Sequence, residues 1–346
     1  PVGHVSLLTP ATHRVQLSRG GGDLPSRVAD DLYWLGRYVQ RAEGTTRLAR
    51  AAVGRAIDQS GFESSRAVHA LASVLLGRAA PAAAEREIIA ALFDDDRAGG
   101  PVIGLARSLQ SVHRLGRLLR DRISVDAWHV LQETERAIRT FTPSPDDLVA
   151  GVPELLDGLV TRLAAFGGLT ADSMTRGQAW RFLDIGQRIE RATSVTRVLR
   201  TLEGDIDLTL LEAVLEIADS SLTYRRRYLT ALDKHAVVDL LLADGTNPRA
   251  VAFQVEAIER HLHALPRDAA HPRQHPERRI AAWLRSRLDE CDAESLCPRG
   301  GESPLLGAFL EQISDRLTTL SEAVAQVYFV HTPGPRRLRS PGEATS

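Results

Sequence analysis

The stretch LGRYVQRAEGTTRLAR, residues 35–50, returns in altered form 150 positions later as IGQRIERATSVTRVLR, residues 185–200. Both copies place apolar or small residues at alternating spacings of three and four, the pattern of a helix that packs along another helix. The paired seam positions are Leu32 and Phe182, Leu35 and Ile185, Val39 and Ile189, Ala42 and Ala192, and Thr46 and Thr196. We therefore expect two long, similar helices that arose by duplication or by convergence on one packing pattern.

The rest of the chain shows the same helical spacing and hardly any alternation of the kind that strands require. The sequence thus predicts an all-α, multi-helix bundle, with two related halves built around paired Glu-Arg helices. Helices are expected at residues 25–59, 63–77, 82–93, 101–120, 123–141, 145–166, 172–203, 207–230, 234–243, 248–264, 276–291 and 303–330.

Some boundaries have a local cause. Ser144 followed by Pro145 is a typical helix start, because serine can cap and proline suits the first helical position. Asn247 and Pro248 predict a second start of this kind, and the pair Gly167-Gly168 predicts a break between helices.

Composition excludes several classes of protein. The net charge of -1 over 346 residues gives no basic excess for nucleic acid or an anionic membrane. There is no apolar run of transmembrane length, and two cysteines are too few for a disulfide scaffold, so we expect a cytoplasmic protein. No phosphate loop, dinucleotide fingerprint or serine elbow occurs, and the histidines and cysteines lack metal-ligand spacing, so no metal or cofactor is expected in this segment.

The arginines of the two long helices need partners, because a buried guanidinium requires carboxylate or carbonyl acceptors. One interpretation is a structural brace, with Arg41 paired to Glu190 and Arg191 paired to Glu43. The other is an anion-binding site, since arginine recognises carboxylate and phosphate with two parallel hydrogen bonds. In that case Arg37 and Arg188 join the cluster.

Two further arginines are candidates for the same site. Arg225 lies in TYRRRY, residues 223–228, and Arg249 lies at an expected helix start whose free N-H groups could receive an anion. A solvated basic turn and a simply capped helix are the plainer interpretations of these two segments.

Four ordered motifs carry a family resemblance: SRVADDLYWLGRYVQRAE at 26–43, MTRGQAWRFLDIGQRIERA at 174–192, TYRRRY at 223–228 and LLLADGTNPRAVAFQ at 240–254. With them the chain resembles the bacterial alpha-E family, a helical domain named for a Glu-Arg motif. The second copy keeps Glu190-Arg191, whereas the first has Gln40-Arg41. An amide at this position can form hydrogen bonds but cannot act as a base.

The resemblance implies a context and a domain layout. Such domains are often fused to, or encoded beside, a circularly permuted ATP-grasp domain, with transglutaminase-like proteins nearby. On that basis residues 1–23 are expected to be the tail of an ATP-grasp-like region with a linker, and residues 24–330 the alpha-E domain. Residues 331–346 are expected to be a disordered tail.

Three functions remain open at this stage. The first is an accessory domain of an ATP-grasp ligase system for peptide or amide bonds, which presents an anionic substrate while the partner supplies ATP and Mg²⁺. The second is a non-catalytic assembly module with buried Glu-Arg pairs. The third is an enzyme in which Glu190 acts as the general base.

Overall fold

The computed structural model describes residues 24–58, 66–80, 84–93, 104–141, 151–204, 206–229, 231–266, 275–297 and 303–329. All the regular structure in these ranges is helical, which confirms the predicted all-α bundle. The expected segments 1–23 and 331–346 and the cap at Ser144 lie outside the described residues.

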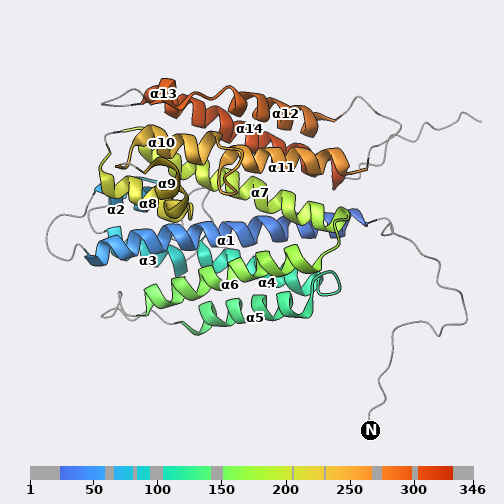
Figure 1. The fold of residues 1–346 in the computed structure, drawn as a ribbon. Helices are drawn as coiled ribbons and strands as arrows, with labels where there is room; N and C mark the ends of the chain where they lie inside the picture. The colour runs from blue at the N-terminus through green and yellow to red at the C-terminus, as the bar shows by residue number, and fades with distance from the viewer. Residues whose placement is uncertain are drawn as a thin grey trace, which may run out of the picture.

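Two long helices form the centre of the bundle. Helix α1 (Ser26–Asp58) and helix α7 (Gln178–Leu199) lie side by side and run in the same direction (Figure 1). The two quoted sequence copies lie on these helices. Their seam residues Leu32, Leu35, Ile185 and Ile189 are all buried.

Each central helix carries its own set of neighbours. Helices α4 (Leu105–Leu118), α5 (Val125–Thr140) and α6 (Val152–Ser173) lie on the side of α1, and α11 (Val251–Ala264), α12 (Pro276–Asp289) and α14 (Pro304–Tyr328) lie on the side of α7 (Figure 1). The remaining helices are α2 (Arg66–Leu76), α3 (Ala84–Phe93), α8 (Leu208–Ile217), α9 (Ser221–Tyr228), α10 (Lys234–Val238) and α13 (Ala293–Leu296), with a 3-10 turn at Arg200–Leu202 and a π turn at Asp239–Ala243.

The two halves correspond helix by helix. Helices α4 and α6 pack on α1, and α5 packs against both of them; in the same way α11 and α14 pack on α7, and α12 packs against both. The buried residues of α5 and α12 correspond at an offset of 150: Ala127 with Glu277, Trp128 with Arg278, Leu131 with Ala281, Thr134 with Leu284, and Ile138 with Leu288. Because the order, contacts and burial pattern all repeat, the structure supports duplication over chance similarity.

Three expected boundaries were wrong. Gly167 and Gly168 lie inside α6, because the buried stripe of this helix continues past them. The segment 207–230 is two helices, since Asp219 adopts a positive φ of 52° between α8 and α9. Helix α11 begins only at Val251, after its N-cap Ala250. Asn247 instead caps a turn ahead of the helix: its Oδ1 accepts a hydrogen bond from Arg249 N at 3.1 Å, and its Nδ2 donates to the Leu240 carbonyl at 3.0 Å.

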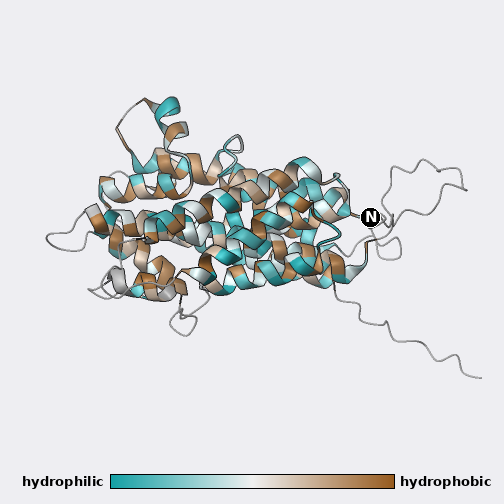
Figure 2. Ribbon diagram, turned by 90° about the horizontal axis from the view of Figure 1, so that it is seen from below, coloured by the Kyte–Doolittle hydropathy of each residue, from teal (hydrophilic) through white to brown (hydrophobic). Residues whose placement is uncertain are grey.

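Hydrophobic and polar residues alternate around the helices (Figure 2). The apolar faces meet in one core cluster that spans both halves. Within the described ranges, no helix is both long enough and apolar enough to cross a membrane.

Candidate functional site

Two glycines set the distance between the central helices. A Cβ on Gly36 would overlap the carbonyl oxygen of Leu183, and a Cβ on Gly186 would overlap that of Tyr33. The two overlaps are equivalent at an offset of 150, so the helices approach closely about a local two-fold axis. This approach brings the arginines of each helix within reach of acids on the other.

Glu190 is the acid at the centre of the first charged cluster. Its side chain is only 2% exposed, and it accepts hydrogen bonds from Arg37 Nε at 2.6 Å and Arg41 Nε at 2.7 Å. Arg41 Nη2 adds a third bond at 2.9 Å. Arg37 continues the network to α14 by donating to Ser321 Oγ at 2.7 Å. Both carboxylate oxygens of Glu190 are therefore occupied.

The electrostatics of this cluster favour the charged forms. Burial by itself would raise the pKa of Glu190, but Arg37 and Arg41 lower it to about 2. Burial would likewise lower the pKa of Arg37, but the Glu190 carboxylate raises it overall. A carboxylate with this pKa and two guanidinium partners is a poor proton acceptor at neutral pH.

Glu43 is the centre of the second cluster. It accepts hydrogen bonds from Arg47 Nε at 2.9 Å and from Arg249 Nη1 at 3.1 Å, and Arg191 Nη2 lies 3.6 Å away. Burial would raise the pKa of Glu43, but the three arginines, Arg191 first among them, lower it to about 2. Asp219 closes the cluster by contacting Arg47 and Arg249 at 3.4 and 3.3 Å.

Arg191 is the least satisfied member of this second cluster. Its Nη2 donates to Gln40 Oε1 at 2.6 Å, but its buried Nε has no hydrogen-bond partner among the described residues. Burial, opposed by Glu43 and reinforced by Arg249 and Arg188, lowers the pKa of Arg191 to about 10. The environment of this guanidinium thus leaves part of its charge uncompensated.

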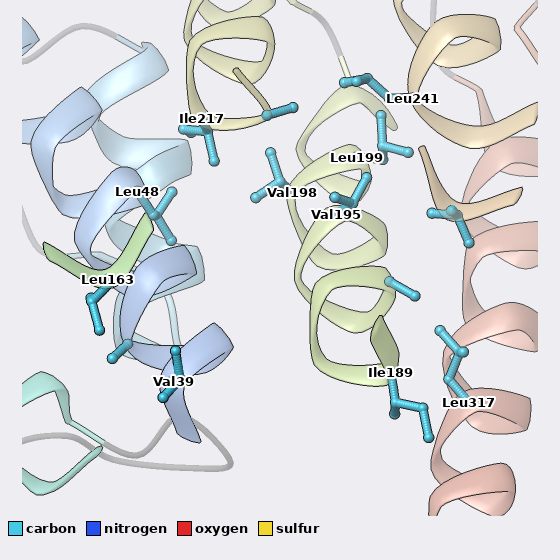
Figure 3. Close-up of a cluster of buried hydrophobic side chains, with 14 of the residues drawn as sticks. Val39, Leu48, Leu163, Ile189, Val195, Val198, Leu199, Ile217, Leu241 and Leu317 are labelled. Atoms are coloured by element: carbon cyan, nitrogen blue, oxygen red, sulfur yellow. The ribbon is translucent and has the colours of Figure 1, made fainter. Parts of the chain in front are cut away.

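A cavity of about 220 Å³ lies between the two clusters, and we call it the axial cavity. It is lined by both members of six residue pairs at an offset of 150: Gln40 and Glu190, Arg41 and Arg191, Gly44 and Ser194, Thr45 and Val195, Arg47 and Arg197, and Leu48 and Val198. The cavity therefore lies on the local two-fold axis. Figure 3 shows Leu48 on α1, Val198 on α7 and Ile217 on α8, three of its apolar lining residues.

Arg197 is a cavity residue that the sequence analysis did not select. Its counterpart Arg47 bonds to Glu43 four residues earlier, but Thr193 stands where the second half would need that acid. No hydrogen bond or ion pair joins Arg197 to any other described residue. Burial lowers the pKa of Arg197; the nearby Glu190 carboxylate opposes this shift, and the charges of Arg41 and Arg37 add to it. The sequence could have indicated this residue, because no acid stands four positions before Arg197 to pair with it.

The other predicted residues divide into two groups. The lining of the axial cavity includes Arg37, Arg41, Glu190, Arg191 and Arg249, and Glu43 contacts three of the lining arginines. Arg188 is outside the lining, because Asp184 at 2.6 Å and Gln254 at 3.2 Å hold it on the far face of α7. Arg225 is exposed on α9 and does not line the cavity either.

The ion pairs that a structural brace requires are also present. Arg41 pairs with Glu190, and Arg191 lies near Glu43. Nowhere in the described part of the chain do three His, Cys, Asp or Glu side chains form a group able to hold a metal ion.

The fold and this site define a class: an all-α domain of two similar halves, joined at a parallel helix pair with buried Glu-Arg contacts. The chain belongs to the Alpha-E family, described as a predicted alpha-helical domain with a conserved ER motif, which matches residues 24–329. Glu190-Arg191 on α7 is one of several Glu-Arg dipeptides in this sequence.

The relatives of the chain are longer proteins. An uncharacterized protein of Mycobacterium bovis and one of Mycobacterium tuberculosis are each 30% identical to it over 337 residues, and a second M. tuberculosis protein is 29% identical. The alignments cover 86% of this chain but 37% of each relative, so the chain spans little more than a third of the proteins it matches. No solved structure matches it.

Proposed function

We propose that the axial cavity binds a small anionic group, a carboxylate or a phosphate. The observation that carries this proposal is Arg197, a partly buried guanidinium at the cavity wall that has Thr193 where its counterpart has an acid. A buried cation without a partner is costly to keep in a folded protein. An anionic ligand that completes the missing ion pair offsets that cost.

The balance of charge around the axial cavity points the same way. Six arginines line it, namely Arg37, Arg41, Arg47, Arg191, Arg197 and Arg249. Among the described residues, three carboxylates contact them: Glu43, Glu190 and Asp219. The cavity therefore carries a positive excess in a setting where water screens charge weakly.

The role of Glu190 follows from its contacts. It fixes the guanidinium planes of Arg37 and Arg41 and leaves no free oxygen for a substrate proton. We therefore assign it a positioning role, and the geometry does not favour the alternative of a general base. Binding, not proton abstraction, is what this arrangement can do.

In the fuller form of the proposal, the domain serves an ATP-grasp ligase system that forms peptide or amide bonds. The domain holds an anionic substrate or an acyl-phosphate intermediate, and the ATP-grasp partner binds ATP and Mg²⁺. A transglutaminase-like protein of the same cytoplasmic system is the second partner. The family resemblance supports these partners, and the positive cavity supports the kind of substrate.

A second candidate is an assembly module without a ligand. The buried contacts of Glu190 with α1 favour it, because ion pairs that bridge helices can fix how the helices pack. The two functions differ in what they expect of the axial cavity: an assembly module has no need of an excess of cations around an open space.

The test is to supply the missing acid from within the protein. Thr193→Glu places a carboxylate four residues before Arg197, in the arrangement of Glu43 and Arg47, and Thr193→Gln is the uncharged control of the same size. We expect inorganic phosphate and butyrate to bind the wild type and Thr193→Gln in calorimetric titrations at low ionic strength. Thr193→Glu should weaken both by at least about tenfold.

Two results contradict the proposal. If neither phosphate nor butyrate binds the wild type, the anion site is wrong and the assembly module is the better proposal. Equal binding to Thr193→Glu and Thr193→Gln would place the anion somewhere other than beside Arg197. Thermal unfolding of the three proteins without ligand shows that each is folded.

A further inference from the structure

The axial cavity has two chemically different walls. The arginines gather around the contact of α1 with α7, whereas α2, α8, the π turn at Asp239–Ala243 and the later turns of both central helices contribute apolar side chains. Among them are Leu48, Val74, Val198, Ile217, Ala218 and Leu241. Several of them appear together in Figure 3. A ligand that fills this space needs a charged end and an apolar body.

The volume limits the size of such a ligand. A cavity of 150 Å³ lined by apolar side chains holds benzene in another protein. At about 220 Å³, the axial cavity has room for roughly nine non-hydrogen atoms on the same scale. Three of these form a carboxylate group, and the rest form a chain or branched body that covers the apolar wall.

The charged end is best matched by a single carboxylate. In the first half of the protein, the position equivalent to the gap beside Arg197 is filled by the Glu43 carboxylate. A ligand carboxylate therefore has a direct precedent in the same structure. A free ammonium group on the ligand is disfavoured, because Glu190 is fully engaged and the surrounding charges are guanidinium groups.

On the basis of the proposed anion site, we propose that its ligand is an aliphatic monocarboxylate of about six to eight carbons with no free amino group. Its carboxylate pairs with Arg197, and its apolar body lies against α2 and α8. This names the substrate class that the domain presents.

A series of straight-chain carboxylates tests the apolar wall. In calorimetric titrations of the wild type with butyrate, hexanoate, octanoate and decanoate, we expect affinity to rise by about fourfold per methylene up to about eight carbons. Decanoate should then bind no better than octanoate, because the cavity is full. Butyrate binding without any gain along the series would overturn this inference and leave the anion site standing. If none of the four carboxylates binds, both the monocarboxylate ligand and the anion site are wrong.

Two further comparisons test the head group. Leucine should bind at least about tenfold more weakly than 4-methylpentanoate, which is the same molecule without the amino group. Hexyl phosphate should bind no better than hexanoate. A preference for leucine or for the alkyl phosphate would overturn the assignment of a monocarboxylate.

A variant locates the apolar body. Ala218 lines the cavity at the end of α8 and is 5% exposed, so Ala218→Leu adds apolar volume to this wall and changes no charge. Octanoate should lose at least about tenfold in affinity while butyrate changes little. Ala282→Leu, at an exposed position on α12, is the matched control and should bind both as the wild type does. Equal loss of butyrate and octanoate in Ala218→Leu would contradict the proposed orientation.

Discussion

Gly36 and Gly186 lie opposite one another where α1 meets α7, and neither has room for a Cβ beside the backbone of the partner helix. Their positions differ by 150 residues, the offset of the sequence copies. The close approach they permit is what brings Arg37 and Arg41 to Glu190. The site therefore depends on two residues that have no functional groups.

Gly36→Ala or Gly186→Ala should destabilise the protein. The added methyl group meets a backbone carbonyl that cannot rotate away, so the helices must separate at a cost of about 1–3 kcal/mol. Urea denaturation measures the free energy of unfolding. Gly54→Ala is the control in the same helix, because nothing lies within 4 Å of its Cβ position. It should stabilise by up to about 1 kcal/mol through helix propensity. Equal effects at Gly36 and Gly54 would contradict the close crossing.

The arrangement of the central pair was readable from the sequence because its signal is local and occurs twice. The spacing of Leu35, Val39, Ile185 and Ile189 fixes which faces are buried, and the structure buries all four. The break at Asp219 was missed because its positive φ has no local signature: aspartate adopts both helical and left-handed backbone.

Site residues were harder to assign than helices, because an arginine can choose among partners that the sequence places far apart. Arg188 was grouped with the site, yet Asp184 four residues earlier binds it. Arg197 was passed over, although the lack of an acid at Thr193 marks it as available. Spacing at i-4 would have separated the two cases. The apolar wall from α2 and α8 could not have been foreseen, since it depends on tertiary packing.

Glu190→Gln should be among the most destabilising single changes in the protein. The amide keeps the shape but removes the charge that balances Arg37 and Arg41, and breaking a buried pair in this way costs about 3–5 kcal/mol. Gln40→Glu changes the equivalent position in the other half, and it adds a negative charge where Glu190→Gln removes one. It places a carboxylate 2.6 Å from Arg191 Nη2, so the free energy of unfolding should stay at or above the wild-type value.

Urea denaturation of the wild type and the two variants measures the change in the free energy of unfolding that each substitution causes. A loss of less than about 1 kcal/mol in Glu190→Gln would mean that the cluster contributes little to folding and that its arginines are positioned by packing alone. A large loss in Gln40→Glu would mean that Arg191 is already compensated.

Stability should fall steeply in acid because of Glu43 and Glu190. Both have a pKa of about 2 in the folded protein, below the ordinary glutamate value of 4.5. A group with a lowered folded pKa stabilises fully above its unfolded pKa and loses that contribution as pH falls towards its folded pKa. Between about pH 4.5 and pH 2, each group should therefore remove about 1.4 kcal/mol of stability per pH unit.

The measurement is the free energy of unfolding by urea from pH 7 down to pH 3. Glu190→Gln should show a shallower decline below pH 4.5 than the wild type, because one of the two carboxylates no longer takes up a proton on unfolding. Glu212→Gln removes an exposed carboxylate on α8 and should leave the wild-type slope unchanged. Parallel declines in all three proteins would mean that the acid sensitivity comes from other carboxylates and that the Glu190 cluster does not hold a lowered pKa.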